Sequence, residues 1–123
     1  MIEKTTTIDT YLEAYGEADA ARRRELIAQA WAPDGVLADP PMDAAGHEAI
    51  DGMFAAVQGS FEGHRFRRTS GVDEHHGVAR YGWELVAPDG SVALSGVDIA
   101  AFDDTGRLAN VTGFFGELPA LES

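Results

Sequence analysis

Three polar side chains stand out as candidates for chemistry: Tyr11, Asp39 and Asp98. Asp98 lies inside the run SVALSGVDIAAF, residues 91–102. Alternate residues of a strand share one face, and all the other residues on the face of Asp98 are apolar or glycine. An unpaired carboxylate on such a face costs on the order of several kcal/mol, unless it is protonated or borders a wet pocket. The sequence therefore predicts that Asp98 faces a cavity, where it could hold or transfer a proton.

The other two candidates also have simpler explanations, which the residues alone leave open. Tyr11 repeats with apolar neighbours at helical spacing and therefore faces inward, where it could serve only for packing. Asp39 precedes Pro40-Pro41 and could be only a turn-forming residue.

The sequence lacks the usual signatures of metal, cysteine and nucleotide chemistry. His47-Glu48 has no second histidine in HExxH spacing, and His64, His75 and His76 do not share one helix face. There is no cysteine, and neither a GxGxxG, a P-loop nor a GxSxG motif occurs. We therefore expect no metal and no cofactor.

Apolar residues repeat at helical spacing in three segments of the first half of the chain. The first helix ends near Gly16, the second is capped by Asp19 and stopped by Pro33, and the third opens at Gly46. Their inward-facing residues include Ile8, Tyr11, Leu12, Tyr15, Leu26, Ile27, Ala30, Trp31, Ile50, Met53, Phe54 and Val57.

From about residue 64 the pattern predicts strands at 64–73, 76–87, 91–102 and 107–116, separated by turns at 74–77, 88–90 and 103–106. A short strand at 36–39 precedes the two prolines. Helices followed by an antiparallel meander predict an α+β fold, with three N-terminal helices packed on one face of a curved antiparallel sheet.

The long hairpin around residues 103–106 is apolar on both faces. Val97, Ile99 and Ala101 point away from the face that carries Asp98. Because the helices cover only one face, we expect a homodimer joined through the outer face of the sheet.

Length and composition limit the class of protein. At 123 residues and 45% hydrophobic content, residues 1–123 form a single domain. The formal net charge of −12 disfavours nucleic acid and anionic membranes as partners. The first residues have no apolar signal region, so we expect a cytoplasmic protein.

Four segments in order, YLEAYGEAD, WAPDGVLADP, GHEAIDGMF and GVDIAAFDDTGRLANVTGFFG, resemble the NTF2-like superfamily, in particular its SnoaL-like and ketosteroid-isomerase-like members. The resemblance covers nearly the whole chain. It implies a cone-shaped cavity between the helices and the sheet, often in a homodimer.

Residue by residue, the resemblance implies that Tyr11 is the catalytic tyrosine, Asp39 the general base and Asp98 a protonated oxyanion donor. Proton transfer next to a carbonyl needs such a base, and donors where charge develops. Trp31 and Phe54 replace two supporting tyrosines of the isomerase, and Trp83 replaces a smaller residue. The expected substrate-binding residues are Trp31, Met53, Phe54, Tyr81, Trp83, Val111 and Phe115.

These observations favour a cofactor-free acid–base enzyme, an isomerase, cyclase or dehydratase, that acts on a small apolar carbonyl compound. The alternative is a non-catalytic ligand-binding or accessory homodimer, and a third candidate is a hydrolase that activates water through the two carboxylates. We expect Tyr11, Asp39 and Asp98 to line one pocket. Tyr11 should approach Asp98 most closely, with Asp39 across the cavity.

Overall fold

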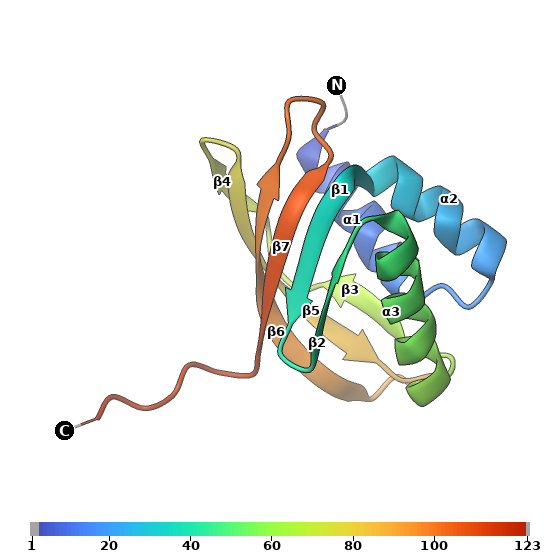
Figure 1. Cartoon of the computed structure of the whole chain (residues 1–123). Coiled ribbons are helices and arrows are strands. Elements are labelled where there is room, and N and C mark those ends of the chain that lie inside the picture. The colour runs from blue at the N-terminus through green and yellow to red at the C-terminus, as the bar shows by residue number, and fades with distance from the viewer. Residues whose placement is uncertain (1–2, 123) are drawn as a thin grey trace.

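The computed structural model describes residues 3–122, which form three helices and a seven-stranded sheet (Figure 1). In chain order the elements are α1 (Lys4–Tyr15), α2 (Ala20–Ala30), β1 (Trp31–Asp39), β2 (Met42–Ala45), α3 (His47–Ser60), β3 (Arg65–Arg68), β4 (Asp73–His75), β5 (Val78–Val86), β6 (Val92–Phe102) and β7 (Leu108–Phe115).

The sheet is mixed, which corrects the expectation of an entirely antiparallel sheet. Its strand order is β2-β1-β7-β6-β5-β3, with β4 paired to β5, and β1 runs parallel to β7. The chain leaves β1 through Pro40-Pro41 and folds back as β2, so the other edge of β1 is free to pair with the last strand. The three helices lie together on one side of the curved sheet (Figure 1).

Local features of the chain explain where α2 and α3 begin and where α2 ends. Asp19 accepts a hydrogen bond from the Arg22 N–H and caps α2, as the sequence predicts. Gly46, at φ 86°, precedes α3 in a conformation that suits glycine. The expectation that Trp31 belongs to the second helix is wrong, because α2 ends at Ala30 and Trp31 already has strand geometry.

Strands β1 to β4 differ from the prediction. Strand β1 begins at Trp31 rather than Val36, and β2 was not expected. Only residues 65–68 of the predicted strand 64–73 form a strand of their own, β3, and Asp73 begins β4, whose other two residues lie in the predicted turn 74–77. Strands β3 and β4 pair with successive parts of β5. The break between them lies beside Gly82, where the Ser70 hydroxyl accepts a hydrogen bond from the Gly82 N–H. A side-chain hydroxyl thus replaces part of the backbone ladder.

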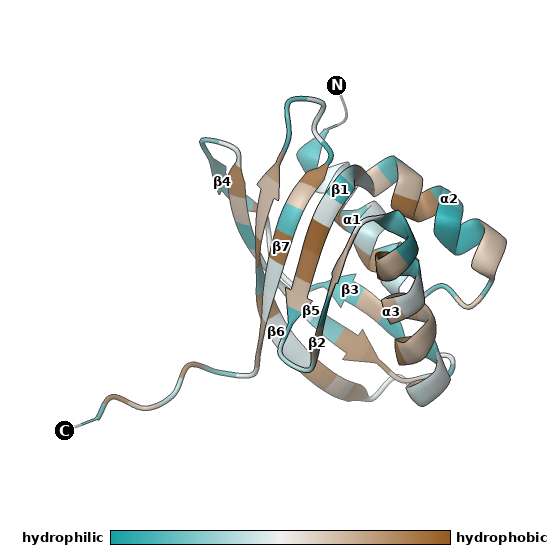
Figure 2. Ribbon diagram, viewed as in Figure 1, coloured by the Kyte–Doolittle hydropathy of each residue, from teal (hydrophilic) through white to brown (hydrophobic). Residues whose placement is uncertain are grey.

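The core lies between the helices and the inner face of the sheet, where Trp31, Tyr11 and Phe54 are the largest fully buried side chains. Figure 2 shows hydrophobic stretches on β1 and β7 next to hydrophilic loops. The buried Arg23 of α2 pairs with Asp51 of α3 at 2.7 Å and ties these two helices together. Across residues 3–122 the helices are all too short or too polar to cross a membrane.

Candidate functional site

A cavity of about 340 Å³ opens between α1, α3 and the inner face of the sheet. Tyr11 from α1, Asp39 from the end of β1 and Asp98 from the middle of β6 all line it. Most of the remaining wall is apolar, with Leu12, Phe66 and Leu94 among its residues. The fold therefore brings three polar groups, far apart in the sequence, to one largely apolar space.

Asp98 is the most deeply buried acid of the site, with 2% of its surface exposed. It faces Tyr81 across the β5–β6 pair, and the Tyr81 hydroxyl donates a hydrogen bond of 2.8 Å to Asp98 Oδ2. The pKa of Asp98 is raised to about 7, mainly by burial and also by the charge of the nearby Asp39, whereas the Tyr81 hydrogen bond opposes the rise. The Asp98 carboxyl is therefore mostly protonated at pH values below neutrality.

Trp83 also lies near this carboxyl. It lowers the pKa of Asp98, although its buried indole Nε1 makes no hydrogen bond to any of residues 3–122. Tyr81 is consequently the direct partner of Asp98.

Asp39 has a phenol partner of its own. The Tyr15 hydroxyl of α1 donates a hydrogen bond of 2.6 Å to Asp39 Oδ2. Burial raises the pKa of Asp39 from its ordinary value, and this hydrogen bond counteracts the rise because it stabilises the carboxylate. Tyr15 was not among the expected site residues, although its spacing of four from Tyr11 places both on one helix face.

The two carboxyl groups meet at Gly113 of β7. A Cβ atom at this position would overlap Asp39 Oδ1 and would lie 3.0 Å from Asp98 Oδ1. The two oxygens consequently lie within about 5 Å of each other. The expectation that Asp39 stands across the cavity from Asp98 is therefore wrong: β1 and β6 are both neighbours of β7, and this places their acids side by side.

Tyr11 is buried beneath the cavity, with 1% of its surface exposed, and its ring packs edge-on against Trp31 at 5.3 Å. Burial, followed by the charges of Asp98 and Asp39, raises its pKa well above the ordinary value, so the hydroxyl stays protonated. Tyr11 and Asp98 line the same cavity, and the hydroxyl that hydrogen-bonds Asp98 is that of Tyr81. No side chain or backbone group of residues 3–122 hydrogen-bonds the Tyr11 hydroxyl, which leaves it available to a ligand.

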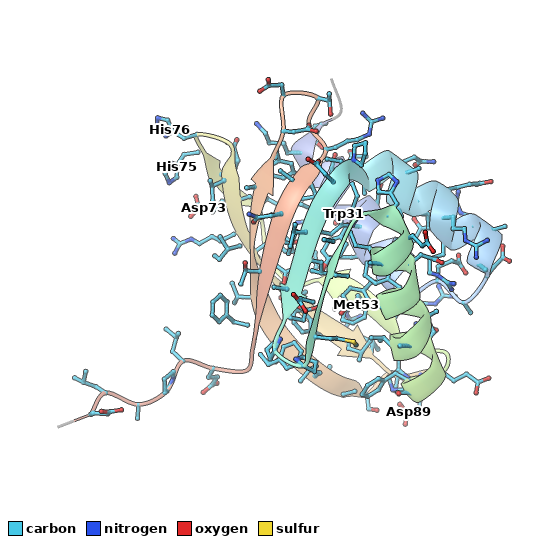
Figure 3. The ribbon with its side chains drawn as sticks, viewed as in Figure 1. Trp31, Met53, Asp73, His75, His76 and Asp89 are labelled. Atoms are coloured by element: carbon cyan, nitrogen blue, oxygen red, sulfur yellow. The ribbon has the colours of Figure 1, made fainter. Side chains whose placement is uncertain are left out.

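Of the seven expected substrate-binding residues, Trp83 and Phe115 line the cavity. The other five, Trp31, Met53, Phe54, Tyr81 and Val111, are buried in the core and do not contribute to its wall. Figure 3 shows Trp31 and Met53 between the helices and the sheet. Periodicity identifies the inward face, but it does not separate residues that fill the core from residues that border a cavity.

Several residues that line the cavity were not predicted as site residues. They are Leu12, Tyr15, Pro41, Met42, Ala56, Val57, Ser60, Phe61, Phe66, Leu85 and Leu94. Alternation with inward-facing neighbours along a strand could have identified Phe66, Leu85 and Leu94 as cavity residues. For Ala56, Val57 and Ser60 the corresponding signal was that they share one face of a helix.

Within the described part of the chain, no group of three or more His, Cys, Asp or Glu side chains could hold a metal ion. His75 and His76 lie at the exposed tip of the β4–β5 hairpin, away from α2 and α3 (Figure 3). The acids and phenols in the wall of the cavity are Asp39, Asp98, Tyr11 and Tyr15.

Comparisons with known proteins agree with this architecture. The sequence model of the SnoaL-like domain matches residues 8–111. A crystal structure from Agrobacterium tumefaciens, provisionally described as an isomerase of the SnoaL-like family, is 37% identical. The match covers 95% of this chain and 100% of that one, with a TM-score of 0.86.

Two more distant structures share the fold. An NTF2-like protein of unknown function from Exiguobacterium is 18% identical over 91% of this chain and 99% of its own, with a TM-score of 0.72. A protein from Sinorhizobium meliloti, provisionally described as a polyketide cyclase, is 17% identical over 92% of this chain and 100% of its own, with a TM-score of 0.69. Comparison with the curated proteins gives no match.

Proposed function

We propose, since the chain belongs to the SnoaL-like family, that its cavity is a cofactor-free acid–base site for a small, mostly apolar carbonyl compound. The observation that carries the proposal is the placement of two carboxyl groups and a free phenol at the polar end of one apolar cavity. The expected reactions are isomerisation, cyclisation or dehydration, which require a proton to be taken from one atom and returned to another.

In this proposal the three groups have different roles. Asp39, the less buried acid, is the general base. Asp98, whose pKa of about 7 keeps it protonated below neutrality, and Tyr11, which stays protonated, donate hydrogen bonds to the oxygen on which negative charge develops. The two carboxyls cannot ionise independently at this separation, so one proton on the pair is the favoured state near neutrality.

The shape of the cavity supports a limited class of ligands. A volume of about 340 Å³ suits a compound of one or two rings. Phe66, Trp83 and Phe115 lie in its wall and offer aromatic surface for a flat apolar ligand.

A panel of small chromophoric enones tests this proposal. We expect Asp39→Asn to reduce turnover by about 10²-fold or more, because a positioned general base contributes factors of that size. Asp43→Asn removes the same charge from the exposed part of β2 and should leave turnover unchanged. Turnover that is equal in wild type and Asp39→Asn would refute the role of Asp39.

A second candidate is a ligand-binding protein without turnover. The observation in its favour is that each carboxyl already has a phenol partner, an arrangement that also suits a fixed polar network. Binding of the enones without turnover in the wild type would favour this alternative.

We also propose that the protein forms a homodimer through the outer face of the sheet. Val97 (41% exposed), Ile99 (37%) and Phe114 (58%) present apolar surface there, on the face opposite the helices. The chain beyond β7 runs away from the helices on this side (Figure 1), and its Leu118 and Leu121 are almost fully exposed. A second copy would cover these apolar groups.

A further inference from the structure

We propose that Tyr15 and Tyr81 are positioning residues, each of which holds one carboxyl by Oδ2 and thereby turns its Oδ1 towards the other carboxyl across Gly113. The inference rests on the proposed acid–base function and assigns its geometry to residues that do not themselves react. Three observations carry it: the two hydrogen bonds, the immobilisation of both phenols, and the space above Gly113.

The two hydrogen bonds select equivalent oxygens. Tyr15 donates to Asp39 Oδ2 and Tyr81 donates to Asp98 Oδ2. The atoms that approach the Gly113 position are the two Oδ1 atoms. Each carboxyl is therefore held by one oxygen and presents the other one to the same point.

Tyr15 is fixed by aromatic packing. Its ring stacks on Phe54 at 4.2 Å and lies 4.3 Å from Phe66, so α3 and β3 hold it from two sides. Burial raises the pKa of Tyr15 far above the ordinary value of a tyrosine, so its hydroxyl stays protonated and can always donate a hydrogen bond. A rigid donor on α1 thus determines the orientation of an acid at the end of β1.

Tyr81 is fixed by the sheet. It lies directly opposite Asp98 in the antiparallel β5–β6 pair, and 2% of its surface is exposed. Cross-strand neighbours on one face lie at contact distance, so the hydrogen bond follows from the strand register. The two acids are therefore oriented by independent elements.

Gly113 provides the space in which the free oxygens meet. It lies opposite Asp98 in the β6–β7 pair, and any side chain there would overlap Asp39 Oδ1. The reacting atom of a ligand, or a proton shared by the acids, would lie between the two oxygens. The arrangement suits a substrate whose proton is removed and returned at positions a few ångströms apart.

Titration of the carboxyl carbons by NMR tests the positioning role without any turnover, so its outcome is separable from that of the enone assay. We expect Tyr15→Phe to raise the apparent pKa of Asp39, because the lost hydrogen bond favours the carboxylate. Tyr81→Phe should mainly raise that of Asp98. The other titratable groups near the pair are Tyr11, from α1, and the more distant Asp9.

The two variants serve as matched controls for each other, since each removes one buried hydroxyl. Carboxyl titrations that do not change in either variant, or that change equally at both acids in both variants, would overturn the assignment. Tyrosines that only filled the core would alter the stability of the protein and would not move one selected titration.

A third variant tests the proximity of the two acids. In Asp39→Asn the negative charge beside Asp98 is removed, so we expect Asp98 to titrate at lower pH than in the wild type. Gly113→Ala should displace the Asp39 carboxyl and give the same direction of change, with Gly52→Ala as the control for an added methyl group. An Asp98 titration that is unchanged in Asp39→Asn would contradict the convergence of the two oxygens.

Discussion

Replacement of Asp98 by asparagine should stabilise the protein at alkaline pH and much less in mild acid. Asparagine keeps an oxygen for the Tyr81 hydroxyl and removes only the ionisation. Below the ordinary pKa of 3.8 the carboxyl is protonated in both the folded and the unfolded chain. As the pH rises towards about 7, only the unfolded chain ionises, so the free energy of unfolding of the wild type falls.

The size of this effect follows from the pKa difference. Each pH unit between 3.8 and about 7 corresponds to about 1.4 kcal/mol, so the full penalty is about 4 kcal/mol above neutrality. At about pH 5.5 roughly half of it is already present. The stability advantage of Asp98→Asn should therefore grow by about 2 kcal/mol between about pH 5.5 and about pH 8.5.

Urea denaturation of both proteins at the two pH values measures this difference directly. Asp104→Asn removes the same charge from the exposed turn between β6 and β7 and controls for the change in net charge. If the advantage of Asp98→Asn over the wild type is the same at both pH values, Asp98 ionises as an ordinary solvated acid, and the account of its burial is incorrect.

Three further predictions concern packing and assembly. Gly52→Ala in α3 should stabilise the protein by about 1 kcal/mol in thermal unfolding, because a Cβ there meets nothing within 4 Å; a loss of stability would show that the helix is constrained at this point. Arg23→Met leaves Asp51 without its buried partner and should lower the free energy of unfolding by about 3 kcal/mol. Arg24→Met removes only the exposed ion pair with Asp51 and should lower it by less than about 1 kcal/mol in the same assay. Equal losses in the two variants would count against a special role of the buried pair. Phe114→Asp should shift a dimer to monomer in sedimentation at micromolar concentration, and a wild type that is already monomeric would remove the proposed interface.

The sequence predicted those parts of the fold that depend on local periodicity. Three helices, the Asp19 cap and the hairpin around residues 103–106 follow from spacing and turn chemistry, and the structure contains each of them. Asp98 could be placed in a cavity because an acid on an apolar strand face needs a special environment. These inferences required no knowledge of strand order.

The remaining features depend on long-range contacts. The parallel pairing of β1 with β7 brings Asp39 beside Asp98, and no local pattern encodes this pairing. Tyr15 and Tyr81 showed only inward periodicity, so their role as partners of the acids could not be separated from packing. Conversely, Trp31 and Phe54 looked like pocket residues, but they fill the core beneath the cavity.

The central claim is that the cavity moves protons at a carbon next to a carbonyl, with Asp39 as the base. The most direct measurement is hydrogen–deuterium exchange at the saturated (α′) carbon next to the carbonyl of a small cyclic enone in D₂O, followed by ¹H NMR with wild type and Asp39→Asn at the same ligand occupancy. We predict exchange faster than in buffer for the wild type, and a rate about 10²-fold or more lower for Asp39→Asn. Exchange at the buffer rate in a wild-type protein that binds the ligand, or equal rates in the two proteins, would contradict the claim.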